Sequence, residues 1–236
     1  MKNLGQNFLK NKHFLKKIAQ ALEINENDTI VEIGGGHGEL SQFLTKAKNL
    51  IILELDRDLF YHLKEKFKNF NNIKVINEDF LKFDLSVFKN NYKLVGNIPY
   101  SITGKIFRKV LKRENFPKLL VFTLQKEVGY KFLEKEKNNF WNTWIKIWGE
   151  VKNLGIIKKN NFYPVPKVDS IIIKIKFFEK PKIKDEENFA KFLKFIFREP
   201  NKKLKNKIDK ELGELKEKRI FELSFEEIIN LWGKLK

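Results

Sequence analysis

The sequence contains no cysteine, and histidine occurs only at positions 13, 37 and 62. The absence of cysteine excludes disulfides and thiolate metal sites, and it is compatible with a cytoplasmic protein. The three histidines have no ligand spacing such as HExxH, so we expect no bound metal.

Long apolar runs are also missing. No stretch reaches 18 apolar residues, which predicts that the chain has no transmembrane helix. The first residues, MKNLGQNFLKNKHF, lack the apolar core of a secretion signal, so we expect a cytoplasmic protein. The 236 residues are 42% hydrophobic and include 23 Phe, enough for a large domain with a small appendage.

Acidic residues are too few to balance the basic ones. The net charge is +18, and long segments such as 1–22 and 151–168 contain lysine but no acid. A third basic segment spans 105–113. The clustering favours a polyanionic partner, most simply nucleic acid. The alternative is a lysine-rich surface of the kind found in thermophiles, since 33% of the residues are charged.

The apolar pattern alternates between strand and helix from the N-terminus onward. This alternation predicts a mostly parallel sheet with helices on both faces, an α/β fold. Predicted strands cover 29–33, 50–55, 73–77, 92–96 and 118–124, and predicted helices cover 11–23, 39–47, 57–68 and 102–113.

The pattern changes after about residue 126. The β-branched run VDSIIIKIKFF predicts a late strand hairpin, and the aromatic run FWNTWIKIW is interpreted as its buried core, with RNA stacking as the alternative. Beyond Pro181 the apolar spacing is helical, for example at Leu204, Ile208 and Leu212. We therefore predict a catalytic domain at 1–180 and a small all-α domain at 181–236.

A glycine-rich loop, EIGGGHGEL, follows the first predicted strand and opens a predicted helix. Its glycines allow close approach of a ligand, and the helix start offers free amides to an anionic group. The spacing of Gly34, Gly36 and Gly38 is G-x-G-x-G rather than G-x-G-x-x-G, which disfavours an NAD dehydrogenase.

Two carboxylates lie at the ends of the next strands. Glu54 is placed to accept hydrogen bonds from both hydroxyls of a ribose, whereas Asp56 fits the N-cap of the following helix. Asp79 is placed either to accept from an adenine amino group or to cap a turn. Together with the glycine loop they indicate a nucleoside ligand at the sheet edge.

Five motifs in order, GQNFL, EIGGGHG, GNIPY, QKEV and FYPVPKVDS, resemble the KsgA-type ribosomal RNA adenine dimethyltransferases. The resemblance implies a Rossmann-like class I methyltransferase fold with a seven-stranded sheet, and S-adenosylmethionine as cofactor. It implies cofactor contacts at the positions listed here: Asn7, Leu9, Gly34, Gly36, Glu54, Asp79, Phe80 and Asn97. It also implies that the ring of Tyr100 stacks on the target base.

The stretch Asn97-Ile98-Pro99-Tyr100 ends a predicted strand in an unusual way. An adenine amino group is a poor nucleophile because its lone pair is delocalised into the ring. The amide oxygen of Asn97 and the carbonyl of Ile98 are two acceptors that would free this lone pair, while Pro99 fixes the loop. Taken alone, Asn-x-Pro also fits a simple turn.

Substrate contacts are expected outside this loop as well. Phe162 is placed to form part of the base pocket. Lys202 and Lys203, with Lys205 and Lys207, are candidates for phosphate contacts on a basic helix face, and a merely solvated face is the alternative. The family's basic run is interrupted here by Glu199 and Pro200, which affects the expected docking rather than the methyl transfer.

The resemblance implies dimethylation of two adjacent adenosines near the 3′ end of small-subunit rRNA. The expected partners are this rRNA and the assembling small ribosomal subunit, with the enzyme acting as a monomer. Two alternatives remain: an Erm-like enzyme acting on large-subunit rRNA, and a non-catalytic RNA-binding assembly factor.

Overall fold

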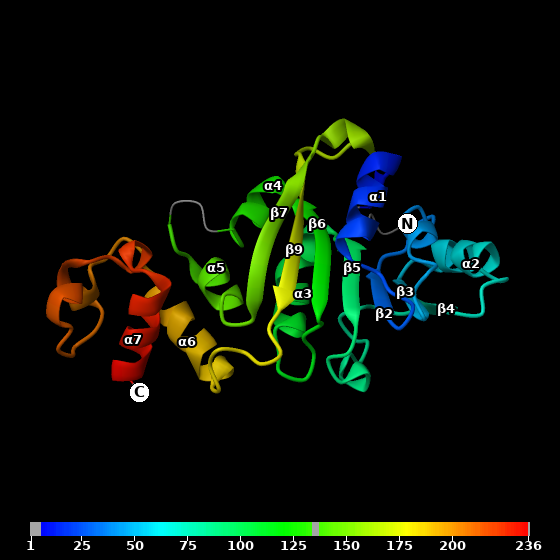
Figure 1. Cartoon of the computed structure of the whole chain (residues 1–236). Coiled ribbons are helices and arrows are strands. Elements are labelled where there is room, and N and C mark those ends of the chain that lie inside the picture. Colours follow the sequence, from blue (N-terminus) through cyan, green and yellow to red (C-terminus); the bar gives the residue numbers. More distant parts are fainter. Residues whose placement is uncertain (1–5, 134–136, 236) are drawn as a thin grey trace. The chain divides into compact units, whose positions relative to one another are not determined.

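The computed structural model describes residues 6–133 and 137–235. The chain divides into two compact units, Met1–Gly129 with Val151–Glu179, and Tyr130–Glu150 with Lys180–Lys236 (Figure 1). The C-terminal segment of the second unit begins at Lys180, close to the predicted domain boundary at 180/181. The second unit also includes Tyr130–Glu150, which was predicted to belong to the catalytic domain.

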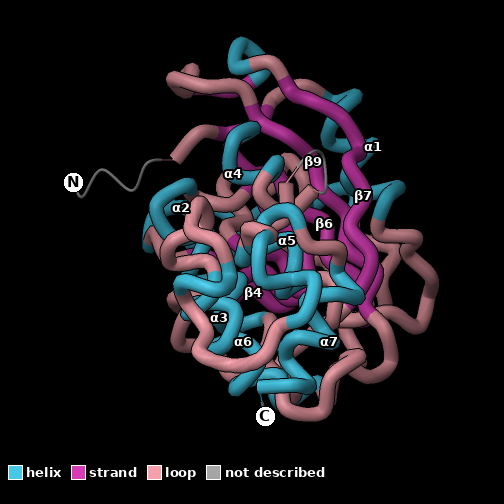
Figure 2. The backbone as a smooth tube through the Cα atoms, turned by 90° about the vertical axis from the view of Figure 1, so that its left-hand side faces the viewer, coloured by secondary structure: helices cyan, strands magenta, loops and turns pink. Residues whose placement is uncertain are grey.

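The first unit is built on a seven-stranded sheet with the strand order β4-β3-β2-β5-β6-β9-β7. The strands of this sheet are β2 (Thr29–Ile33), β3 (Asn49–Glu54), β4 (Ile73–Asn77), β5 (Lys93–Asn97), β6 (Leu119–Gln125), β7 (Gly149–Ile157) and β9 (Ser170–Phe177). Pairs among β2 to β6 are parallel, and β9 joins β6 antiparallel. Figures 1 and 2 show β6, β9 and β7 side by side. The predicted α/β class and the late antiparallel strand are confirmed.

The helices of this unit are amphipathic segments that cover the sheet. They are α1 (Lys12–Ala21), α2 (Arg57–Lys66), α3 (Thr103–Val110) and α4 (Lys126–Tyr130). Successive strand residues face opposite sides, so Val121 of β6 joins the cluster of buried residues that includes Leu15 of α1. The next residue, Phe122, contacts Phe107 of α3 with ring centroids 5.8 Å apart. The two faces of β6 are thus covered by α1 and α3.

Asp56 caps α2, as the sequence predicted. Its Oδ1 accepts hydrogen bonds from the backbone N–H groups of Asp58 and Leu59 at 3.0 and 3.1 Å. This contact satisfies two of the N–H groups that every helix start leaves without a partner inside the helix.

The second unit contains α5 (Phe140–Ile145), α6 (Glu186–Ile196) and α7 (Phe225–Leu235). The aromatic run is helical, so its assignment to a strand hairpin is wrong, although Trp144 and Trp148 are buried as expected. The backbone N–H of Lys182 donates to the carbonyl of Ile147 at 2.7 Å, and α5 contacts α6. These contacts explain why Tyr130–Glu150 belongs to this unit.

The segment between α6 and α7 is not one helix. It forms three 3-10 turns, η5 (Leu204–Asn206), η6 (Gly213–Glu217) and η7 (Ile220–Glu222). Leu204, Ile208 and Leu212 are buried, so the helical spacing marked burial correctly but not the hydrogen-bond pattern. No helix in the described part of the chain is long and apolar enough to cross a membrane.

Candidate functional site

A cavity of about 500 Å³ opens at the carboxyl ends of β2, β3, β4 and β5. The strand order reverses here, because β3 and β5 flank β2 on opposite sides. Ligands of open α/β sheets bind at such a switch point. Residues lining the cavity are Gln6, Asn7, Phe8, Ile33, Gly34, Gly36, Leu53, Glu54, Leu55, Glu78, Asp79, Phe80, Leu81, Asn97, Ile98, Pro99, Ser101 and Ile102.

The glycine loop forms one wall of this cavity. Gly34 and Gly36 have φ angles of +70° and +57°, a region that favours glycine. A Cβ atom on Gly36 would lie 3.0 Å from the ring of Phe8, so glycine lets the N-terminal segment close on the loop. The backbone N–H of Gly34 donates to Leu53 at 2.8 Å and ties the loop to β3.

The helix predicted at 39–47 is wrong. The residues form turns around a short 3-10 helix, η1 (Ser41–Phe43), with bonds such as Leu44 N–H to Ser41. Leu40, Leu44 and Ala47 are buried, so the spacing reflected a buried face without α-helical bonding. No α-helix therefore starts within residues 34–48, so the expected helix N-terminus facing an anionic group is not formed there.

Glu54 lies at the end of β3 with its carboxylate held from two sides. Oε2 accepts from the backbone N–H of Gly36, and Oε1 accepts from that of Asp56, both at 2.9 Å. Burial raises the pKa of Glu54, and these backbone donors oppose part of the rise. Each carboxylate oxygen keeps a further acceptor position, so the pair can still accept from a ribose diol.

Asp79 and Phe80 follow β4 and also line the cavity. Asp79 does cap a turn, because Oδ1 accepts from the N–H of Leu81 at 2.9 Å. The cap and the position in the cavity wall are compatible, since the second carboxylate oxygen makes no hydrogen bond to another described residue. The side chain of Phe80 is buried and supplies an apolar surface.

Lys109 of α3 holds this loop in place. Its Nζ donates to the carbonyl of Leu81 at 3.0 Å and to that of Phe83, and it lies 5.6 Å from the ring centroid of Phe80. Partial burial lowers the pKa of Lys109. In the sequence Lys109 is only one of several basic residues in 105–113, and its anchoring role follows from tertiary contacts.

Asn97 ends β5 with its side chain fixed. Its Nδ2 donates a 2.6 Å hydrogen bond to the carbonyl of Asn7, which leaves Oδ1 as the part available to a ligand. The N–H of Ile98 donates to Thr123 at 3.0 Å, and no residue in the described part of the chain donates to the Ile98 carbonyl. Pro99 has φ −57° and its carbonyl accepts from Ile102, which closes the turn.

Leu9 and Phe162 do not line the cavity. They pair across a two-stranded sheet of β1 (Phe8–Leu9) and β8 (Phe162–Tyr163), and both side chains are buried. Because strand residues alternate, Phe8 faces the cavity while Leu9 points to the opposite face. Any contact of Leu9 with a ligand is therefore made by its backbone.

The remaining predicted site residues lie elsewhere. The side chain of Tyr100 is outside what the structure describes, and only its backbone at the start of η3 (Tyr100–Ile102) is placed. Lys202 and Lys203 belong to the second unit. There Lys202 pairs with Glu199 at 2.6 Å, and Lys203 pairs with Glu217 at 2.7 Å.

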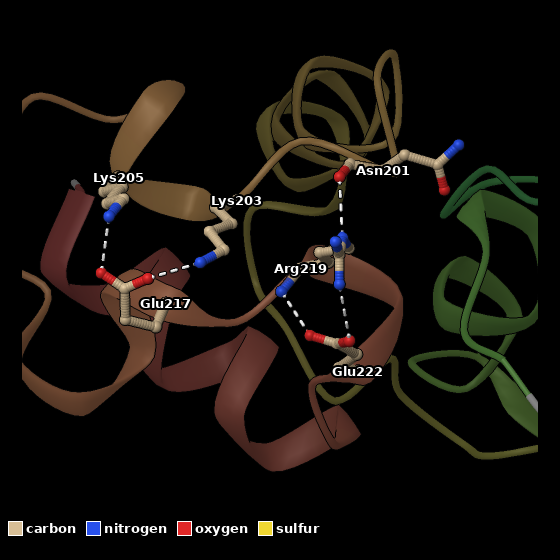
Figure 3. Close-up of polar contacts among 6 residues, drawn as sticks. All are labelled: Asn201, Lys203, Lys205, Glu217, Arg219 and Glu222. Atoms are coloured by element: carbon tan, nitrogen blue, oxygen red, sulfur yellow. Dashed lines mark hydrogen bonds and ion pairs between the residues drawn. The ribbon is translucent and has the colours of Figure 1, made fainter.

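Figure 3 shows how the basic groups of that segment are held. Glu217 accepts from both Lys203 and Lys205 at 2.7 Å, and the two lysines lower its pKa to about 2. Arg219 contacts Glu222 and the carbonyl of Asn201. The predicted basic helix face is thus a set of turns in which Lys202, Lys203 and Lys205 already have acidic partners, and Lys207 donates to the carbonyl of Ile196 at 2.9 Å.

Sequence reasoning missed several residues of the site. Phe8, Leu55 and Ser101 line the cavity, and no strand was predicted at residues 8 and 9 whose alternation could have indicated Phe8. Glu32, directly before the glycine loop, is 1% exposed, and burial raises its pKa to about 8. The nearby Ser41 hydroxyl opposes part of this rise, although Oε2 of Glu32 meets no hydrogen-bond partner among the described residues.

The composition of the cavity fits S-adenosylmethionine. Glu54 offers acceptor positions for a ribose, and Phe80 and Ile98 offer apolar surface for an adenine. No α-helix starts within residues 34–48, so the glycine loop lacks the helix start on which a dinucleotide pyrophosphate binds, in agreement with the glycine spacing that disfavours NAD. Fold and cavity define a class I methyltransferase that depends on S-adenosylmethionine.

Comparison with known proteins identifies the family. The family model described as ribosomal RNA adenine dimethylase matches residues 1–226, and the chain belongs to this family. A relative from Hydrogenobaculum sp., ribosomal RNA small subunit methyltransferase A, is 36% identical over 99% of this chain and 92% of its own length. The protein of the same name from Malacoplasma penetrans is 39% identical over 84% of this chain and 72% of its own.

Solved structures support the fold. The 23S rRNA methyltransferase ErmE has a TM-score of 0.82 at 23% identity, with 97% of this chain and 99% of that chain covered. A dimethyladenosine transferase from Plasmodium falciparum has a TM-score of 0.81 at 24% identity, with coverage of 96% and 98%. The predicted fold class and family are both confirmed.

Proposed function

We propose that this protein transfers methyl groups from S-adenosylmethionine to the exocyclic amino nitrogen of two adjacent adenosines in the 3′-terminal hairpin of small-subunit rRNA. The observation that carries the chemistry is one cavity lined by both Glu54 and the loop Asn97-Ile98-Pro99. The relatives named ribosomal RNA small subunit methyltransferase A support small-subunit rRNA as the target, and the two adjacent adenosines of the 3′-terminal hairpin rest on the resemblance of the sequence motifs.

Some residues of the cavity bind the cofactor, and others bind the target base. Glu54 accepts from the ribose of the cofactor, Asp79 and Phe80 hold its adenine, and the glycine loop with Asn7 and Leu9 closes around it. When bound, the cofactor supplies an activated methyl group on a sulfonium. Oδ1 of Asn97 and the carbonyl of Ile98 accept from the target amino group, and this releases the nitrogen lone pair for attack.

Positioning is the main contribution of the protein to the rate. Well-oriented reactants gain several orders of magnitude without acid–base catalysis. Asn97 is suited to this role because its amide is anchored to Asn7 by a 2.6 Å hydrogen bond. Tyr100 stacks on the target base. A base taken out of its helix gains about 1–3 kcal/mol from such stacking.

The second unit serves for docking on the assembling subunit. Its exposed lysines, Lys202 and Lys203 among them, contact rRNA phosphates once they exchange their acidic partners for RNA. The enzyme acts as a monomer during ribosome biogenesis in the cytoplasm.

The test is incubation with labelled S-adenosylmethionine and unmethylated small subunits, followed by mapping of the modified nucleosides. We expect dimethyladenosine at two adjacent positions of small-subunit rRNA. Label only in large-subunit rRNA would support an Erm-like enzyme instead. RNA binding without cofactor affinity in calorimetry would support a non-catalytic assembly factor.

A further inference from the structure

The β1–β8 ribbon brings an exposed aromatic ring next to the cavity. Phe8 pairs directly with Tyr163, and Leu9 with Phe162. Residues opposite each other in an antiparallel pair place their side chains on the same face. Leu9 and Phe162 share the buried face, so Tyr163 shares the other face with Phe8, which lines the cavity.

Tyr163 is the outward member of this pair. The residue is 62% exposed, so its ring is accessible to a ligand. The Nζ of Lys10 lies 4.3 Å from the ring centroid, in cation–π distance. Lys10 is fixed from the other side, because its backbone N–H donates to Asn161 at 3.0 Å.

Lysines also precede and follow Tyr163 in the sequence. Lys159 and Lys167, each four residues away, are exposed like Lys10, and none of the three forms an ion pair with another described residue. Lys158, by contrast, is paired with Asp169 at 3.0 Å. An exposed ring beside unpaired lysines is the combination that single-stranded nucleic acid binds, with bases on the ring and phosphates on the cations.

We propose that Tyr163 is a stacking platform for the nucleotide adjacent to the target adenosine, and that Lys10 contacts its phosphate. This subsite rests on the proposed function and adds a flanking-nucleotide contact to it. The ring belongs to the residue paired directly with Phe8 of the cavity wall, which places it next to the opening through which an extruded adenosine enters. Such a contact holds the RNA in register while two neighbouring adenosines are methylated.

The first experiment compares Tyr163→Ala and Tyr163→Phe on unmethylated small subunits at saturating S-adenosylmethionine. Stacking predicts that Tyr163→Ala raises the KM for RNA about tenfold while kcat changes less than twofold, and that Tyr163→Phe retains the wild-type KM. Phe70→Ala is the matched control, because this ring is also exposed, at 42%, but precedes β4 at the opposite end of the sheet. It should keep the wild-type KM.

The second experiment separates stacking from a structural role. Short RNAs with and without the base next to the target adenosine are titrated by fluorescence anisotropy in the presence of S-adenosylhomocysteine. Removal of that base should weaken binding to the wild type about tenfold and leave binding to Tyr163→Ala unchanged. Calorimetry should give the same affinity for S-adenosylmethionine in both proteins.

Different results would contradict the proposed function and the proposed stacking platform. A wild-type protein that forms no dimethyladenosine contradicts the proposed function. An active wild type whose KM is unaffected by Tyr163→Ala contradicts the stacking platform alone, and so does an equal response of both proteins to loss of the neighbouring base.

Discussion

The side-chain amide of Asn97 is anchored to the backbone carbonyl of Asn7 by a 2.6 Å hydrogen bond. The bond joins residues 90 positions apart in the sequence, and it uses the donor of the amide so that the acceptor remains for substrate. The orientation of the Asn97 amide is thus set by a contact between the N-terminal segment and the end of β5.

We expect Asn97→Ala to abolish detectable methyl transfer, because it removes both the acceptor and its anchor. A loss of at least about 100-fold in kcat follows from misplacement alone. Affinity for RNA, measured by anisotropy, should stay near the wild-type value since it depends on phosphate contacts. Asn97→Asp is the companion variant: it keeps an acceptor but cannot donate to Asn7, and it should also be impaired. Equal loss of RNA affinity and transfer would show that Asn97 is mainly structural.

Lys109→Met should weaken S-adenosylmethionine binding about tenfold. The change keeps the length of the side chain but removes the ammonium group that holds the carbonyls of Leu81 and Phe83. A hydrogen bond to a charged group contributes about 1.5–3 kcal/mol. Isothermal calorimetry measures the effect, and Lys112→Met, an exposed position just after α3, is the control. Unchanged cofactor affinity in Lys109→Met would mean that the loop holds its shape without this anchor.

Glu32 makes stability depend on pH. Its pKa is raised from 4.5 to about 8 in the folded state, so the folded protein holds this proton more tightly than the unfolded chain. The contribution of this bound proton to the free energy of unfolding is present in full below pH 4.5 and is lost as the pH rises toward 8. Relative to the wild type, Glu32→Gln should therefore gain stability between pH 5 and pH 8 by about 3 kcal/mol.

Urea denaturation at the two pH values checks this prediction. Glu26→Gln, at an exposed position, should show no such change with pH. The same stability difference between Glu32→Gln and wild type at both pH values would show that the carboxyl titrates near its ordinary pKa.

Glu217→Gln should strengthen RNA binding. The substitution frees Lys203 and Lys205, which both pair with Glu217 at 2.7 Å. Two further phosphate contacts would steepen the salt dependence, the slope of log K against log salt, by about 2. Glu214→Gln removes the same charge from the same turn, η6, at a position with no ion pair in the described residues, and it should change the slope little. Identical slopes for both variants would mean that only net charge matters.

Much of the site was determined by local sequence. The β-branched and apolar runs specified the strands, and Glu54, Asp79 and Asn97 follow them directly, so the parallel arrangement brings these residues to one edge of the sheet. Strand 29–33 and strand 73–77 were predicted with the bounds that the structure has. Side chains of a strand alternate between the two faces of the sheet, and this local pattern is visible in a short run of sequence.

Other features needed the tertiary structure. The apolar spacing of 39–47 and of 204–212 reported which side chains are buried, but a buried face is compatible with 3-10 turns as well as with an α-helix. The partner of Lys203 also depends on where the chain folds back, because Glu217 lies 14 residues further along the sequence, whereas Lys202 pairs locally with Glu199.

The sequence by itself therefore determined the family, the sheet and the residues at its strand ends. Tertiary structure alone decided that Phe8 rather than Leu9 faces the cavity, that Asn97 is held by Asn7, and that Tyr163 stands beside the cavity with Lys10. The physical reason is range: strand and turn preferences act between neighbours, whereas these contacts join segments separated by 90 residues or more and exist only once the sheet has formed.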